Sequence, residues 1–173
     1  MKNITKVFVA ATLVLGFSNS SFAQSTATAS ASATIITPIS ITKTIDLNFG
    51  NIAVSATTGG TVILDATGSR TTGGGGGVTL PATTGTVAAA SFDVAGAASF
   101  TYAITLPSSV VTITSGSNSM DVTSFTSIPS ATGTLSTGGT QTLTVGATLA
   151  VAAGQAPGSY TNATGIPVTV NYN

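Results

Sequence analysis

The sequence predicts an all-β protein built as an antiparallel β-sandwich with Greek-key connections. Three observations predict this fold class: Thr, Val and Ile dominate, apolar residues recur at every second position, and helical periodicity is absent. Such alternation gives an extended segment one apolar face for a core and one polar face for water. Short strands that follow one another closely, with Gly-rich turns between them, favour a sandwich.

The first 23 residues have the pattern of a secretory signal peptide. Lys2 and Lys6 precede an apolar run over residues 7–16, and small residues stand at Ser21 and Ala23. The apolar run is too short to anchor the chain in a bilayer. We therefore expect cleavage after Ala23 and export to the periplasm, the cell surface or the medium, with residues 24–173 as the mature chain and no transmembrane segment in it.

Alternation identifies the strands that we expect in the mature chain. The clearest segments are 39–49, 88–94, 100–106, 143–151 and 166–172, and shorter candidates are 62–64, 78–80, 110–113 and 120–125. Turn residues separate them at 59–60, 73–77, 115–118 and 138–139. Most aromatic residues lie on the same alternating face as the aliphatic ones, so we expect the aromatics to be buried.

The composition argues against catalysis and cofactor binding. The chain contains no His, Cys, Glu or Trp, so a serine nucleophile has only Lys43 and four aspartates as candidate bases. Zinc lacks its usual ligands, and the aspartates are too scattered along the chain for a calcium loop. Two aspartates that converge as a glycosidase pair are the remaining enzymatic alternative. We expect no enzyme, no catalytic or metal-binding residue and no cofactor.

The charge of the mature chain limits its partners. After cleavage only Lys43 and Arg70 remain as cations, against four aspartates. A nucleic-acid partner would need dense positive charge, so we expect none. Because the chain has no cysteine, burial of the core alone must hold the fold.

Two motifs carry a resemblance to known families. They are Leu-Asn-Phe-Gly-Asn-Ile at 47–52 and Gly-Ser-Tyr-Thr at 158–161, the latter continued by Val-Thr-Val-Asn-Tyr at 168–172. With these motifs the chain resembles a bacterial family of secreted domains of unknown function over nearly all of its mature length. The same motifs are similar to those of archaic chaperone-usher pilins with the spore-coat-protein-U type domain.

The pilin resemblance implies an immunoglobulin-like, pilin-like sandwich and an exported structural or adhesive protein, such as a subunit of a biofilm-promoting pilus or fibre. It implies copies of the chain itself, a periplasmic chaperone and an usher as partners. It places Leu47, Phe49 and Gly50 in an early core strand and the turn that leaves it. The sequence departs from the pilin pattern because the usual disulfide is missing and because Pro167 interrupts the backbone donors of the final strand.

Two sets of residues are candidates for assembly. The resemblance implies that the alternating carboxyl-terminal strand faces the chaperone through Ile166, Val168, Val170 and Tyr172. Near the amino end, small or apolar residues alternate with Ser and Thr at Ala27, Ala29, Ala31, Ala33 and Ile35. The hypothesis is that residues 24–36 add as a donor strand to the open edge of a neighbouring sandwich formed by residues 37–173.

Two alternatives stay open at this point. Residues 24–36 can instead be the first strand of their own sheet or a disordered leader. The whole protein can also be a self-contained secreted binding module that recognises carbohydrate or another surface through a Thr-rich sheet face or its glycine loop.

Overall fold

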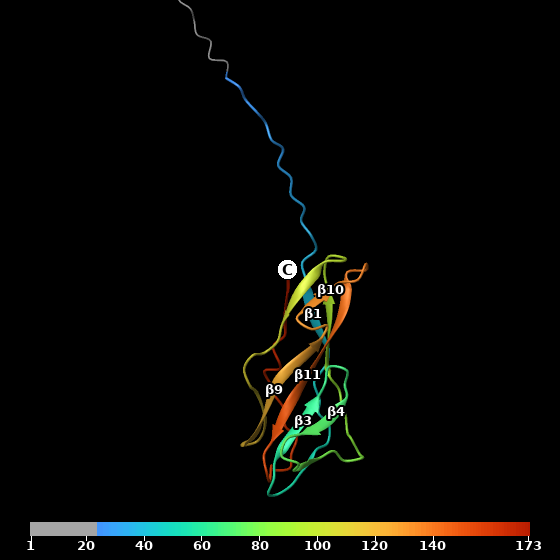
Figure 1. The fold of residues 1–173 in the computed structure, drawn as a ribbon, viewed down its shortest axis with the longest axis vertical. Helices are drawn as coiled ribbons and strands as arrows, with labels where there is room; N and C mark the ends of the chain where they lie inside the picture. The colour runs from blue at the N-terminus through green and yellow to red at the C-terminus, as the bar shows by residue number, and fades with distance from the viewer. Residues whose placement is uncertain (1–23) are drawn as a thin grey trace, which may run out of the picture. The chain divides into compact units, whose positions relative to one another are not determined.

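The computed structural model describes residues 24–173, and the expected signal peptide at 1–23 lies outside the described residues. The chain divides into two units, residues 1–34 and residues 35–173, which are described separately. In the first unit, residues 24–34 are all exposed and belong to no strand. The second unit is an all-β domain, and no helix occurs in the part of the chain that the structure describes (Figure 1).

The domain contains twelve strands. They are β1 (Ser40–Ile45), β2 (Ala53–Val54), β3 (Gly60–Leu64), β4 (Arg70–Gly73), β5 (Val78–Thr79), β6 (Ala90–Ala95), β7 (Thr101–Thr105), β8 (Val111–Ser115), β9 (Asn118–Ile128), β10 (Thr132–Thr134), β11 (Thr140–Val151) and β12 (Thr169–Tyr172).

The long strand β11 organises the larger sheet. One edge of β11 pairs first with β6 and then with β3, while the other edge pairs with β9, and all three pairings are antiparallel. Outside these partners, β1 pairs with β6, β4 with β3 and β8 with β9, which completes a seven-stranded sheet. Strands β9 and β11 therefore run side by side through the domain (Figure 1).

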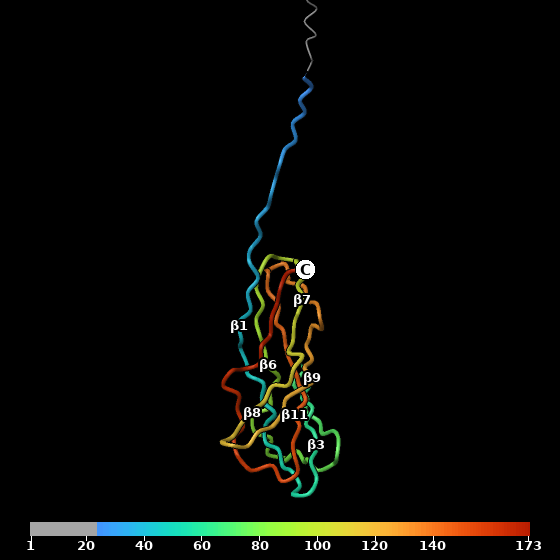
Figure 2. The backbone as a smooth tube through the Cα atoms, turned by 90° about the vertical axis from the view of Figure 1, so that its left-hand side faces the viewer, coloured from blue at the N-terminus to red at the C-terminus, as the bar shows by residue number. Residues whose placement is uncertain are grey.

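Smaller sheets provide the second layer. The strands β10, β7 and β12 form a three-stranded sheet, and β2 and β5 form a two-stranded one. The carboxyl end of the chain lies beside β7 because β12 pairs with that strand (Figure 2). The sheets enclose an apolar interior, as the alternating sequence requires.

The core has two parts along β11. Leu143 and Val145 face one part, and Ala147, Leu149 and Val151 face the other. The first part, called the β7 core, also contains Ala90, Phe92, Val94, Tyr102, Leu135 and Val170. The second, called the β3 core, also contains Phe49, Val62, Leu64, Val78 and Val122. Leu47 and Phe125 are partly buried and contact both parts, so they join the two cores.

The predicted all-β class and its antiparallel sandwich arrangement are confirmed, with local differences. The sequence did not predict β2, β4 and β10, which are short and carry little alternation. The expected first strand over 39–49 ends at Ile45, and β3 begins inside the expected turn, at Gly60. The expectation of buried aromatics is wrong for Phe100, whose side chain is 45% exposed.

Candidate assembly surface

The motif at residues 47–52 forms a locked turn rather than a reactive site. Asn48 exchanges two backbone hydrogen bonds with Ala88, at 2.8 and 2.9 Å, and its side-chain oxygen accepts a third from the Gly50 amide. The Arg70 guanidinium donates to the carbonyl oxygens of Phe49 and Asn51. These bonds satisfy the backbone where β-pairing stops, so the motif stabilises the fold.

Gly50 is required at the centre of this turn. Its φ is +70°, and a Cβ atom built there would lie 2.3 Å from the carbonyl oxygen of Thr84. Only glycine adopts this conformation without strain and also leaves room for the neighbouring backbone.

The motif at residues 158–161 also serves the fold. The Tyr160 hydroxyl donates to the carbonyl oxygen of Ala156 at 2.7 Å and accepts from the side-chain Nε2 of Gln155 at 2.8 Å. Thr161 exchanges two backbone hydrogen bonds of 2.9 Å with Thr114 of β8. The segment before the last strand is thereby held against the larger sheet.

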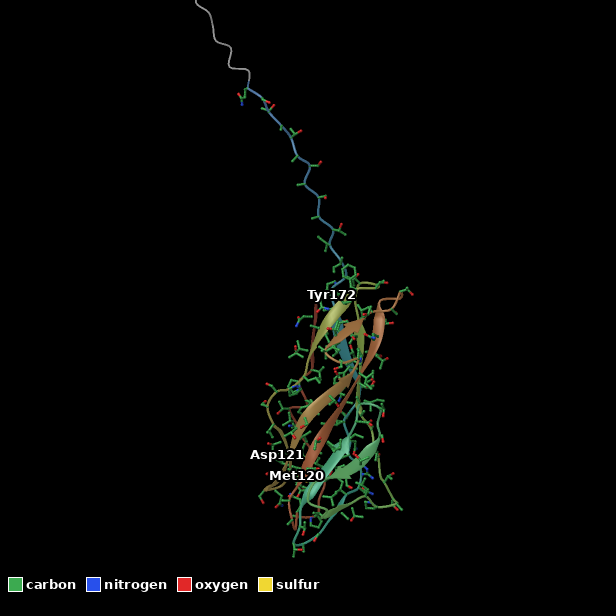
Figure 3. The ribbon with its side chains drawn as sticks, in the orientation of Figure 1. Met120, Asp121 and Tyr172 are labelled. Carbon is green, nitrogen blue, oxygen red and sulfur yellow. The ribbon has the colours of Figure 1, made fainter. Side chains whose placement is uncertain are left out.

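Tyr172 connects the last strand to the beginning of the domain. Its hydroxyl donates to the carbonyl oxygen of Thr37 at 2.7 Å and accepts from the Ala97 amide at 2.6 Å. Its ring meets that of Phe100 edge to face, with ring centroids 5.8 Å apart, while Met120 and Asp121 lie far from it toward the other end of the domain (Figure 3). The residue implied to face a chaperone therefore makes intramolecular bonds in the isolated chain.

The remaining carboxyl-terminal candidates divide by position. Ile166 and Val168 are half-buried and precede β12, whereas Val170 lies in β12 and points into the β7 core. The expected final strand over 166–172 is shorter in the structure, because β12 starts at Thr169, after Pro167. In the described part of the chain β12 pairs with β7 alone, so its other edge is unpaired.

The amino-terminal candidates are not packed. Ala27, Ala29, Ala31 and Ala33 are exposed and belong to no strand. Ile35, the first residue of the second unit, is 98% exposed. A large aliphatic side chain with this exposure contributes nothing to the stability of its own domain.

The structure adds a surface feature that the sequence did not indicate. A hollow of about 310 Å³ opens beside the end of β7 and the second half of β9, and we call it the β7–β9 hollow. Its lining residues are Ile104, Leu106, Phe125, Thr126, Ser127, Ser130 and Ala131. Ile104 and Leu106 are far along the chain from the other lining residues, which lie within 125–131, so no local pattern could have predicted their meeting.

The edge of β9 beside this hollow is open. β8 pairs only with Asn118 to Val122, the first part of β9, while β9 continues to Ile128 along β11. No other described strand pairs with the outer edge of this second part of β9. An unpaired edge presents backbone donors and acceptors that can pair with an added strand.

The four aspartates are engaged locally. Asp46 pairs with Lys43, Asp93 accepts from the Thr142 hydroxyl, and Asp121 accepts from the Thr112 hydroxyl. The Thr67 hydroxyl, followed by the Ser69 amide, lowers the pKa of the Asp65 carboxyl, because both donate to its charged form.

The alternative of two aspartates that converge as a glycosidase pair is not realised by Asp93 and Asp121. These residues stand opposite Thr142 and Ala150 of β11, so about 27 Å of strand separates them. A second hollow of about 270 Å³ contains Asp121 as its one charged lining residue. Among residues 24–173, no group of three or more acidic side chains could hold a metal ion.

The strands define an all-β sandwich domain, and both sequence motifs make hydrogen bonds within it. Residues 39–172 match the model of a family described as a domain of unknown function, DUF4402, and the chain belongs to this family. No curated protein and no solved structure matches the chain. Within the described residues, no helix is both long and apolar enough to span a membrane.

Proposed function

We propose that this chain is an exported, non-enzymatic structural or adhesive protein of the bacterial cell surface, and that it assembles into a fibre or pilus. Residues 24–36 of each subunit act as a donor strand for the next. One observation carries the proposal: this segment is exposed and alternates in side-chain size, while the attached sandwich has open strand edges.

Strand addition suits the chemistry of the segment. Residues 24–36 contain no charge and no proline, so every amide can donate to a neighbouring strand. Backbone hydrogen bonds would provide affinity, and the side chains on one face, from Ala27 to Ile35, would enter the neighbour. The Ser and Thr residues of the other face would stay in water.

The lack of catalytic groups supports a structural role. The described carboxylates are hydrogen bonded to nearby Thr, Ser or Lys residues, and both sequence motifs are used to close the fold. Export rests on the signal-peptide pattern of the first 23 residues. The open edge of β12, with Val170 and Tyr172, is the surface that a periplasmic chaperone would cover before an usher assembles the fibre.

A pair of adjacent substitutions tests the donor strand. Ala31→Asp places a charge on the face that enters the neighbour, whereas Ser30→Asp places the same charge on the opposite face. We expect filaments of the mature protein in negative-stain micrographs, their loss in Ala31→Asp and their retention in Ser30→Asp. Equal assembly of the two variants, or dispersed particles from the unaltered protein, would contradict the proposal.

A second candidate function is a self-contained binding module. The outer face of the larger sheet carries cross-strand threonines, with Thr148 between Thr123 and Ile63, and Thr142 beside Asp93. This hydroxyl-rich face with few charges favours a neutral polysaccharide. Dispersed particles that bind a polysaccharide, and lose binding after Thr142→Lys and Thr148→Lys, would support the module over the fibre.

A further inference from the structure

We propose that the β7–β9 hollow accepts Ile35 of a second copy of this chain, and that the residues next to Ile35 pair with the open edge of β9. The inference rests on the proposed fibre function and adds to it the acceptor site and the anchoring side chain. Neither follows from the sequence.

The walls of the hollow suit an aliphatic side chain. Ile104, Leu106 and Phe125 are partly buried and belong to the border of the β7 core, so an inserted side chain would extend that core. The remaining lining residues are Ser, Thr and Ala, and none is charged. Burial of an apolar group here removes water from apolar surface without leaving a charge unpaired.

The backbone beside the hollow can bind a strand. Phe125 to Ser127 line the hollow and also belong to the part of β9 whose outer edge is unpaired. The register of β9 against β11 shifts near Ser124, whose φ is +51°. We therefore place the added strand beyond this bulge, along residues 125–128, which span about 14 Å.

Ile35 is the matching anchor. It is the one large side chain on the alternating face of residues 24–36, where the other members are alanines. Its 98% exposure shows that it does not occupy the hollow of its own chain. At protein interfaces a few buried anchor residues usually carry most of the binding energy, and the contacts around them contribute little.

The length and charge of residues 24–36 are compatible with binding at the β7–β9 hollow. The segment is thirteen residues long by its bounds, 24–36, and is therefore longer than the short edge that it would cover. It is uncharged, as is the hollow, so association requires no desolvation of an ion. We expect Ile35→Ala to weaken association roughly tenfold to a hundredfold, as for the loss of one buried aliphatic side chain.

Site-specific cross-linking of the mature protein tests the contact, since the natural chain has no cysteine. A tagged Ile35→Cys variant is mixed with untagged Ser130→Cys, which lies on the rim of the hollow, under mild oxidation. The control mixture replaces Ser130→Cys with Thr71→Cys, an exposed residue of β4. We expect the mixed disulfide dimer to form preferentially with Ser130→Cys.

Substitution at the rim provides a second measurement. Thr126→Arg should block the hollow and abolish both the cross-link and assembly, whereas Thr142→Arg on the outer face of the larger sheet should leave both intact. Circular dichroism and the urea midpoint verify that both variants are folded.

The cross-linking and filament results test the acceptor site and the fibre function separately. Equal cross-linking to Ser130→Cys and Thr71→Cys, or closure of the disulfide within one doubly substituted chain, overturns the hollow as the acceptor of a second copy. If filaments still form in that case, the fibre function stands and only the site is wrong. Without filaments and without the cross-link, both proposals fail.

Discussion

Tyr172→Phe tests whether the last strand is locked to the beginning of the domain. The substitution keeps the ring and its contact with Phe100 but removes the hydroxyl that bonds Thr37 and Ala97. A hydrogen bond contributes about 1 kcal/mol net, so the loss of two should lower the free energy of unfolding by about 2 kcal/mol. With a urea m-value near 2 kcal/mol/M, the unfolding midpoint should fall by about 1 M.

Equilibrium urea unfolding of the mature protein, followed by circular dichroism, measures this change. Ser40→Ala is the matched control, because it removes an exposed hydroxyl whose bond to the Ala95 carbonyl oxygen is long, at 3.4 Å. We expect the control to change stability by less than about 0.5 kcal/mol. The reasoning is refuted if Tyr172→Phe and Ser40→Ala have the same midpoint, and amide exchange at Ala97 should be faster only in the former.

Three further predictions follow from the packing and the turns. Gly50→Ala should lower the free energy of unfolding by at least about 1–2 kcal/mol, because the left-handed conformation and the Thr84 carbonyl oxygen both oppose a Cβ atom. An unchanged midpoint in urea unfolding would contradict this. Leu64→Ala, at a fully buried site, should lower the free energy of unfolding by about 2–5 kcal/mol. Ile63→Ala, on the opposite face of β3, should lower it by less than about 1 kcal/mol. Equal losses in the two variants would show that the faces of β3 are assigned wrongly. Burial raises the pKa of the Tyr102 phenol, so the stability present below about pH 10 should fall as pH rises through the folded pKa. A difference spectrum in which the Tyr102 phenol of the folded protein ionises at the ordinary tyrosine pKa would refute this.

The periodic part of the sequence was sufficient to predict most strands. Along β11, the residues from Leu143 to Val151 alternate so regularly that only an extended strand puts the apolar ones on a common face. The prediction of strand ends was weaker, because backbone geometry rather than side-chain alternation decides where a strand ends. The first strand ends at Ile45, just after a register shift between Lys43 and Ile45, and alternation of side chains does not report this irregularity.

For residues 24–36, too, the sequence determines some properties and the structure determines others. Its small-and-polar alternation and lack of charge are visible in the sequence, but its exposure and the 98% exposed side chain of Ile35 are properties of the structure. The acceptor hollow combines the end of β7 with β9 and the residues that follow it, and β7 is separated from these along the sequence. Only the folded arrangement could identify it.

By itself, the sequence determined the all-β class, the neutral and cysteine-free core, and the segment that is able to extend as a strand. These are local properties, because the spacing and chemistry of neighbouring residues decide them. The tertiary structure alone decided which strand edges stay open, where the β7–β9 hollow lies, and that Tyr172 bonds to Thr37. Those features depend on contacts between residues far apart in the chain, because the order in which the strands pair determines which residues meet.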